Sequence, residues 1–163
     1  MMSNRTSVIR INNPASQCEI IIDKPAHVVY DFVTTVSNWI GIHPACKGIE
    51  GDDGLDKEAT VGLKFTETID VRGWVFQCHW EVRKMVKNQY FEFSLPTDFI
   101  LPPVYNTIIT YIFDPIGDNQ TRFIRTMINC TDANATPEQK ADFADTDMHT
   151  DYLNAVKARL EMS

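Results

Sequence analysis

Alternating apolar and polar positions run through the middle of the chain. Between residues 61 and 71, Phe65 and Ile69 share one side with the acidic Glu67, while lysine and threonine occupy the other side. Residues 74–82 alternate more clearly still, with one side made of Trp74, Phe76, Cys78, Trp80 and Val82. A period of two is typical of a strand with one buried and one solvated face. The same reasoning predicts strands at residues 17–23, 46–51, 90–95, 105–113 and 121–130.

Helical periodicity appears near both ends of this strand-rich region. After Pro25, apolar residues at positions 29, 32, 33 and 36 follow the i, i+3, i+4, i+7 rule, and residues 39–44 predict a second short helix or a tight turn. The segment 136–139 reads Thr-Pro-Glu-Gln, a capping box. A helix from there to Glu161 would have about 25 residues and a length of roughly 37 Å. Its predicted apolar stripe is Ala141, Met148, Tyr152, Val156 and Leu160.

This order of elements predicts an α+β fold. Residues 1–16 form an N-terminal arm, either loose or an edge strand, and residues 17–163 form a single ligand-binding domain. A curled antiparallel sheet of about six or seven strands surrounds the long C-terminal helix, with two short helices after the first strand. Twisted sheets of that size curl, and only the C-terminal helix is long enough to cover the concave face. A helix in the mouth of a curled sheet leaves a cavity, the usual place for a hydrophobic small molecule.

Several segments resemble the helix-grip superfamily. They are the segment IDKPAHVVYDFVTTVSNWIGIHP at residues 22–44, Val61-Gly62, the turn from Gly117 to Arg122, and the ending from Asn154 to Glu161. The superfamily includes START lipid-transfer domains, the birch-pollen-allergen type and polyketide cyclases and dehydratases. The resemblance spans about residues 17–161 and implies the helix-grip fold. Members bind lipids, hormones, polyketides or proteins and share no catalytic motif, so it implies no catalytic residue.

The net charge, the apolar runs and the cysteine spacing exclude several classes of protein and of binding partner. The net charge is −7, and no basic stripe is present, which argues against nucleic acid. No apolar run has the length of a signal peptide or a membrane span, and the four cysteines show no CxxC spacing. We therefore expect a cytoplasmic protein with neither membrane insertion nor a disulfide framework. No motif indicates a cofactor, the histidine spacing indicates no metal site, and the sequence allows a homodimer.

Glu67 is the leading candidate for chemistry, because strict alternation places its carboxyl group on the apolar face. Burial would raise its pKa and suit it to general acid or base catalysis. The alternatives are a bulge that turns it to solvent, or a pairing with Arg122 or Arg125. These two arginines lie on opposite faces of the last strand, and the sequence does not tell which one faces inward.

His149 is the second catalytic candidate. Asp145 precedes it by four residues, so the two side chains can touch on one helix face, either as an oriented base or as a solvent-facing ion pair. We expect the ligand to contact a set of aromatic, histidine and methionine side chains: Trp39, His43, Phe65, Trp74, Phe76, Trp80, Phe93, Tyr111, Met148 and Tyr152. The loop 94–104, rich in proline and apolar residues, is predicted to be a lid.

Two functions fit these observations. The first is a cyclase- or dehydratase-like enzyme that binds an aromatic or polycyclic molecule and moves protons without a cofactor. The second is a carrier or sensor of a lipid-like ligand that performs no chemistry. An ionisable group inside the cavity favours the enzyme, and Glu67 and His149 both facing water would favour the carrier. A co-chaperone-like interaction domain would instead show a large exposed apolar patch.

Overall fold

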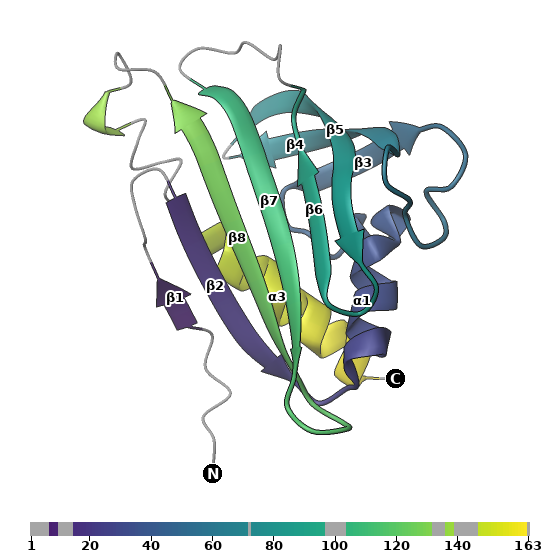
Figure 1. Ribbon diagram of the computed structural model, residues 1–163. Coiled ribbons are helices and arrows are strands. Elements are labelled where there is room, and N and C mark those ends of the chain that lie inside the picture. The colour runs from purple at the N-terminus through teal and green to yellow at the C-terminus, as the bar shows by residue number, and fades with distance from the viewer. Residues whose placement is uncertain are drawn as a thin grey trace.

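One antiparallel sheet forms most of the protein (Figure 1). The computed structural model describes residues 7–9, 15–71, 73–96, 104–131, 136–138 and 147–162. The strands are β1 (Ser7–Ile9), β2 (Ala15–Ile22), β3 (Cys46–Gly51), β4 (Lys64–Val71), β5 (Trp74–Val86), β6 (Tyr90–Ser94), β7 (Val104–Pro115) and β8 (Thr121–Thr131). They lie in the order β1-β2-β8-β7-β6-β5-β4-β3. The predicted α+β class is confirmed, and β1 is an edge strand.

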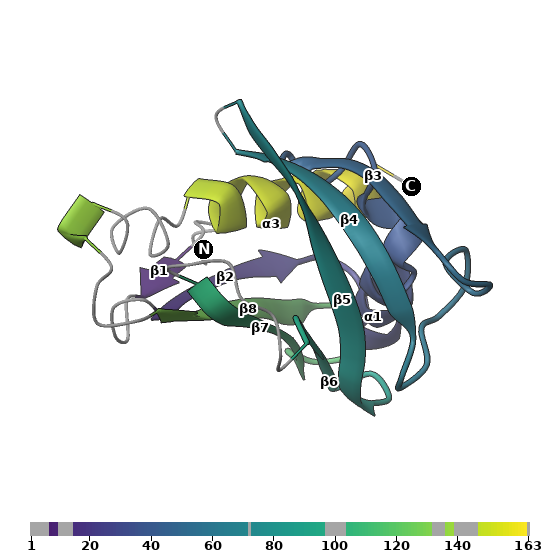
Figure 2. The same ribbon diagram turned by 90° about the horizontal axis from the view of Figure 1, so that it is seen from above.

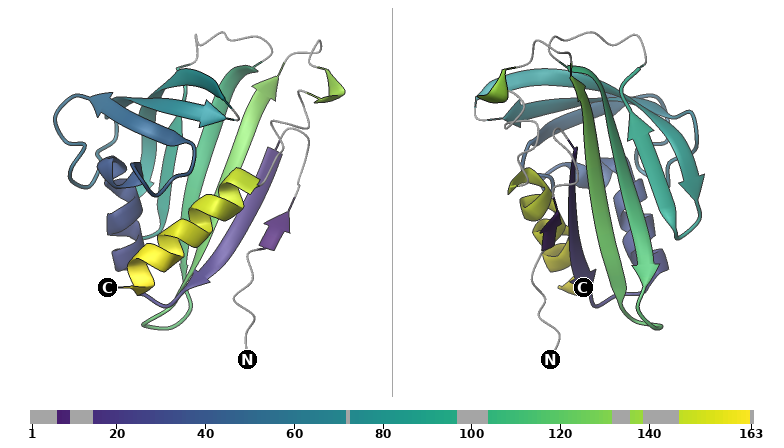
Figure 3. Two further views of the ribbon diagram at one scale, coloured as in Figure 1. Left: turned by 180° about the vertical axis from the view of Figure 1, so that it is seen from behind. Right: turned by 60° about the vertical axis from the view of Figure 1, so that its left-hand side comes forward.

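The helices lie on the concave side of this sheet (Figures 2 and 3). Two short helices, α1 (Ala26–Thr34) and η1 (Val36–Trp39), follow β2. Their number is as predicted, but the second was expected at residues 39–44 and lies three residues earlier. The C-terminal helix α3 (Asp147–Glu161) crosses the open side of the curled sheet and contacts β2. Residues 139–146 lie outside the described residues, so one continuous helix from residue 136 stays a prediction.

Polar contacts hold the end of α3 to β2. The Lys157 ammonium donates to the carbonyl oxygen of Ile21 at 2.9 Å and pairs with Glu161 one turn later. The Glu161 carboxylate also accepts the backbone N–H of Asp23 at 2.8 Å. The helix is thereby held across the sheet, and its buried residues Tyr152, Leu153, Val156 and Leu160 face the interior.

Aromatic rings fill the core between the sheet and the short helices. Trp39 lies at its centre, with ring centroids 5.5 Å from Phe65, 5.1 Å from Phe93 and 6.3 Å from Tyr111. Its indole N–H donates to the carbonyl oxygen of Val33 at 2.9 Å, so the buried ring leaves no donor unsatisfied. Burying such a ring stabilises the fold by about 2–3 kcal/mol before packing is counted.

The tip of the β4–β5 hairpin extends past α3 (Figure 2). Trp74 lies near that tip and is 55% exposed, and the neighbouring Phe76 is half-buried at 4.7 Å between ring centroids. The expectation that Trp74 is buried on the inner face of its strand is therefore wrong, and its contact with a ligand stays a prediction. The alternation gave its side of the strand correctly, but the strand continues beyond the region that α3 covers.

Candidate functional site

Five ionisable side chains meet between the inner face of the sheet and α3. They are Glu67 from β4, Tyr111 from β7, Arg125 from β8, and His149 and Tyr152 from α3. All five are buried, with exposed fractions of 4% or less for each residue: Glu67 3%, Tyr111 0%, Arg125 3%, His149 0% and Tyr152 0%. We call this group the interior cluster. Buried ionisable groups in such density are typical of functional sites.

Glu67 faces the interior because the β4–β5 register leaves no bulge at that point. It lies opposite Cys78, two residues along the strand from the Phe65–Trp80 pair and on the same face. The Trp80 indole N–H donates to Glu67 Oε1 at 3.0 Å. Burial raises the pKa of Glu67, and the hydrogen bonds from Trp80 and Cys46 and the charge of Arg125 oppose that effect only in part. The net effect shifts this carboxyl group toward its protonated form relative to an exposed glutamate.

Two thiols border the same carboxyl group. Burial, and after it the proximity of Glu67, raises the pKa of both Cys46 and Cys78 to about 12. Both therefore stay protonated, and neither is a nucleophile at neutral pH. The three cysteines whose side chains are described, Cys18, Cys46 and Cys78, are free.

Arg125 is held by a neutral histidine. Its Nη1 lies 2.9 Å from His149 Nδ1, and His149 Nε2 lies 3.0 Å from the Ser16 hydroxyl oxygen. A guanidinium group can only donate, so Nδ1 accepts and the imidazole proton resides on Nε2, facing Ser16. Burial and the adjacent Arg125 charge lower the pKa of His149 to about 2. His149 is therefore uncharged at any physiological pH, and its basic nitrogen is already occupied.

The two tyrosines stack beneath the guanidinium group. The rings of Tyr111 and Tyr152 lie 5.9 Å apart, and the Arg125 guanidinium carbon lies 6.0 Å and 5.5 Å from their respective centroids. Burial raises the pKa of both phenols, so both hydroxyl groups stay protonated. The ring centroids of His43 and Tyr152 lie 4.9 Å apart, with the two rings tilted by 30°. Burial, followed by the Arg125 charge, lowers the pKa of His43 to about 3.

Unpartnered polar atoms concentrate in the interior cluster. Among the described residues, five buried side-chain atoms have no hydrogen-bond partner in good geometry, and four of them belong to this cluster: Glu67 Oε2, Tyr111 Oη, Arg125 Nε and Tyr152 Oη. The Tyr111 hydroxyl lies close enough to Tyr152 and Arg125 for weak hydrogen bonds that influence its pKa, but neither contact has good geometry. Buried polar groups are normally satisfied, so four exceptions in one place require an explanation. The arrangement can donate several hydrogen bonds to a molecule that enters it.

Comparison with known proteins places the chain in a family. No family model matches. Penitrem biosynthesis cluster 1 protein I from Penicillium ochrochloron is 97% identical over 148 residues, which are 91% of this chain and 97% of that protein. This chain belongs to the protein I family. None of its described helices is long and apolar enough to cross a membrane.

Solved structures show that this protein I relative has the helix-grip fold. The Zhui aromatase/cyclase from a Streptomyces species matches with a TM-score of 0.73 and 15% identity, over 96% of this chain and 94% of that chain. A START superfamily protein from Mycobacterium smegmatis matches with a TM-score of 0.71 and 11% identity, over 91% of this chain and 97% of that chain. The resemblance stated from the sequence is confirmed at the level of the fold.

In this protein I family member, most of the predicted site residues lie together in the core. Trp39, His43, Phe65, Trp80, Phe93, Tyr111 and Tyr152 are all buried in the core, with Glu67 and His149. The side chain of Met148, the proposed partner Asp145 and most of the predicted lid lie outside the described residues. Their ligand-binding and catalytic roles stay predictions.

Two further site residues emerge only from the structure. Arg125 is the inward-facing arginine of β8, since Arg122 has a side chain 41% exposed and pairs with Asp114. Ser16 contacts His149 from β2. Ser16 shares its side of the strand with the buried Cys18 and Ile20, so an extension of the predicted strand by one residue would have revealed it.

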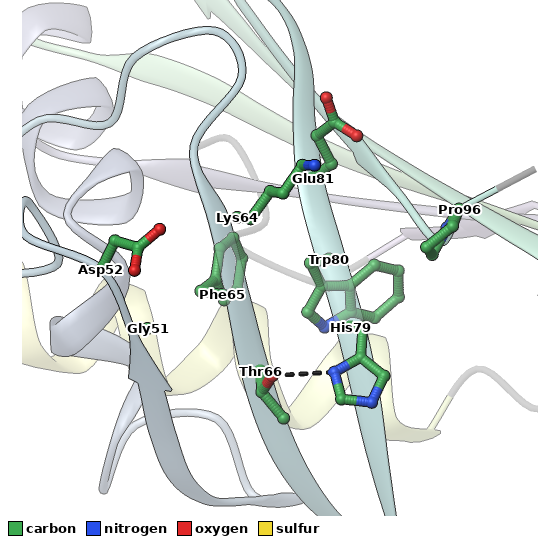
Figure 4. A pocket seen from close by; sticks show the side chains of 9 residues that line it. All are labelled: Gly51, Asp52, Lys64, Phe65, Thr66, His79, Trp80, Glu81 and Pro96. Carbon is green, nitrogen blue, oxygen red and sulfur yellow. Dashed lines mark hydrogen bonds between the residues drawn. The ribbon is translucent and has the colours of Figure 1, made fainter.

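A recess of about 360 Å³ lies elsewhere, against β3, β4 and β5 (Figure 4). It is lined by Gly51, Asp52, Lys64, Phe65, Thr66, His79, Trp80, Glu81 and Pro96. The Thr66 hydroxyl and His79 Nδ1 are 2.8 Å apart there. Both side chains occupy positions that alternate with Glu67 and Trp80, so they lie on the outer face of the sheet. The recess also contacts the buried residues Phe65 and Trp80, and Trp80 donates to Glu67 of the interior cluster.

The described residues offer no metal-binding cluster. Among the residues that the structure describes, no three histidine, cysteine, aspartate or glutamate side chains are grouped closely enough to hold a metal ion. The predicted internal cavity also stays a prediction, because residues 97–103 and 139–146 are not among those described.

Proposed function

We propose that the protein binds an apolar small molecule between the sheet and α3 and acts on it by acid–base catalysis, as a cyclase- or dehydratase-like enzyme. The observation that carries the proposal is the set of four unpartnered polar atoms in the interior cluster. A buried polar group without a partner costs about 1–3 kcal/mol, so the set lowers the stability of the ligand-free fold. Oxygen atoms of a bound ligand would satisfy these groups.

Glu67 is the proton donor in this proposal. Trp80 occupies Oε1, so the proton of the neutral carboxyl group resides on Oε2, the atom without a partner. In its protonated form, which the raised pKa favours, this carboxyl group can protonate a carbonyl, hydroxyl or ether oxygen of the substrate. An ionisable group on the inside favours an enzyme over a carrier, and Glu67 is such a group, whereas His149 stays uncharged.

The apolar surroundings fit the same proposal. Phe65, Phe93 and Trp80 border the cluster and would contact the hydrocarbon part of a ligand. The Penicillium relative is named for a penitrem biosynthesis cluster, and the Zhui protein is named an aromatase/cyclase. These names support a role in the biosynthesis of a small molecule.

A complementation experiment tests the proposal. A Penicillium ochrochloron strain that lacks protein I would receive this chain or its Glu67→Gln variant, and penitrems and accumulating intermediates would be measured by mass spectrometry. The variant keeps the shape and the acceptor for Trp80 but has no acidic proton. We expect turnover to fall by about 10²–10⁴-fold.

The matched control is Glu50→Gln, an exposed carboxyl group of the neighbouring strand β3. It should restore production as the unmodified chain does. Full production with Glu67→Gln would contradict catalysis by Glu67 and would favour a carrier. Native mass spectrometry of the purified protein would then identify the cargo.

A further inference from the structure

Arg125 is a buried cation without a counter-ion in the described part of the chain. Its residue is 3% exposed, and none of the ion pairs among the described residues includes it. Its hydrogen-bond partner His149 is neutral, as the donor-only guanidinium group requires of Nδ1. His149 therefore fixes the orientation of the cation without neutralising its charge.

No described group around Arg125 forms an ion pair with it, although Glu67 is near enough for the Arg125 charge to lower its pKa. Tyr111 and Tyr152 present ring faces to the guanidinium group, which attract a cation only weakly. Glu67 forms its hydrogen bond with Trp80 and no ion pair with Arg125. A buried, unpaired charge is costly, and a partner of opposite sign recovers that cost only if it enters the same site.

The atoms near Arg125 that are free to form hydrogen bonds are donors, and they favour an anion as the positive charge does. Arg125 Nε can only donate, and the neighbouring phenol groups, which lie close to each other, can donate a hydroxyl hydrogen to an entering acceptor. An oxygen atom that carries negative charge would accept from these groups and compensate the cation at once. A basic amine would instead be repelled by the charge of Arg125.

We propose that the ligand of this site is an apolar molecule with one anionic oxygen, such as a carboxylate, a phenolate or an enolate, and that Arg125 selects it. His149 is the positioning residue that holds Arg125 in place through its neutral Nδ1. This inference rests on the proposed function only because it requires a ligand to bind between the sheet and α3.

Two dyes of matched shape test the charge preference. 1-Anilinonaphthalene-8-sulfonate carries an anionic sulfonate, and N-phenyl-1-naphthylamine is its neutral counterpart. We expect the wild-type protein to bind the anionic dye about 10- to 100-fold more tightly, the range expected for a charge-assisted hydrogen bond. Arg125→Met should abolish the preference and keep the neutral dye bound. Arg122→Met, on the outer face of the same strand, should leave the preference unchanged.

The outcomes separate this inference from the proposed function. Equal affinity for the two dyes in the wild-type protein, or an unchanged preference in Arg125→Met, overturns the selection of an anion. Saturable binding of the neutral dye with quenching of tryptophan fluorescence would still support an interior site. If neither dye binds to the folded protein, both proposals are wrong.

A second comparison keeps the test decisive if Arg125→Met does not fold. Dodecanoate and dodecanol would compete with the neutral dye on the wild-type protein, and dodecanoate should displace it at about a tenfold lower concentration. For His149, the Gln variant retains an acceptor for Arg125 and a donor for Ser16, so it should keep the dye preference. The Leu variant should lose the preference while binding the neutral dye. Loss of both dyes together would indicate a purely structural role and overturn the positioning assignment.

Discussion

Replacing His149 with glutamine should make the stability of the protein less sensitive to acid. The pKa of His149 is about 2 in the folded protein and about 6.5 in an unfolded chain. Between these values the unfolded chain binds a proton that the folded protein does not. The contribution to stability is therefore complete above pH 6.5 and is lost as the pH falls below it.

The size of this loss follows from the same two values. A full proton difference changes the free energy of unfolding by about 1.36 kcal/mol per pH unit. Since the unfolded histidine is only partly protonated near pH 6.5, the loss between pH 7 and pH 5 is about 1.9 kcal/mol for one histidine. His43, whose folded pKa of about 3 also lies below this window, contributes a similar amount.

Urea unfolding followed by circular dichroism at pH 7, 6 and 5 measures the effect. His149→Gln should be less stable than the wild type at pH 7, because Arg125 loses an ideal acceptor. It should then lose about 1.9 kcal/mol less than the wild type on going to pH 5. His27→Gln, at an exposed position, is the matched control and should follow the wild type. An unchanged pH dependence in His149→Gln would refute the assignment of His149 as a neutral acceptor.

Two further variants test the contacts that support the site. Trp80→Phe removes the hydrogen bond to Glu67 and should raise the pKa of that carboxyl group further. The infrared carbonyl band of protonated Glu67 should then persist to higher pH than in the wild type. A shift of this band to lower pH would contradict the argument. Glu161→Ala removes the acceptor for Asp23 and the partner of Lys157, so the free energy of unfolding should fall by about 0.5–1 kcal/mol. Hydrogen exchange at the end of α3 should accelerate, and unchanged exchange would show that these contacts do not hold the helix.

Strand alternation predicted the inward position of Glu67 because β4 has a well-defined apolar side. Phe65 and Ile69 flank it, and the register with β5 contains no bulge there. The order of elements and the resemblance to known sequences likewise predicted the helix-grip fold. Where one face of an element is clearly apolar, the sequence alone determines the direction of each side chain.

Other parts of the site depend on pairing that no local pattern reveals. On β8, Phe123 and Ile124 are both apolar, so alternation could not decide that Arg125 rather than Arg122 faces inward. On α3, the buried stripe includes the polar His149, and a stripe defined by apolar residues misses it. The orientation of the His149 ring is set by its hydrogen bond with Arg125, a residue 24 positions away in the sequence.

The unpartnered polar atoms under α3 also limit how the chain can evolve. Apolar side chains of similar volume in place of a buried, poorly compensated charge often leave a protein equally or more stable. Selection for heat resistance alone would therefore favour the loss of Glu67 and Arg125 while the fold persisted. A descendant with an apolar interior would therefore be more stable but would have lost the groups that bind or react with a ligand.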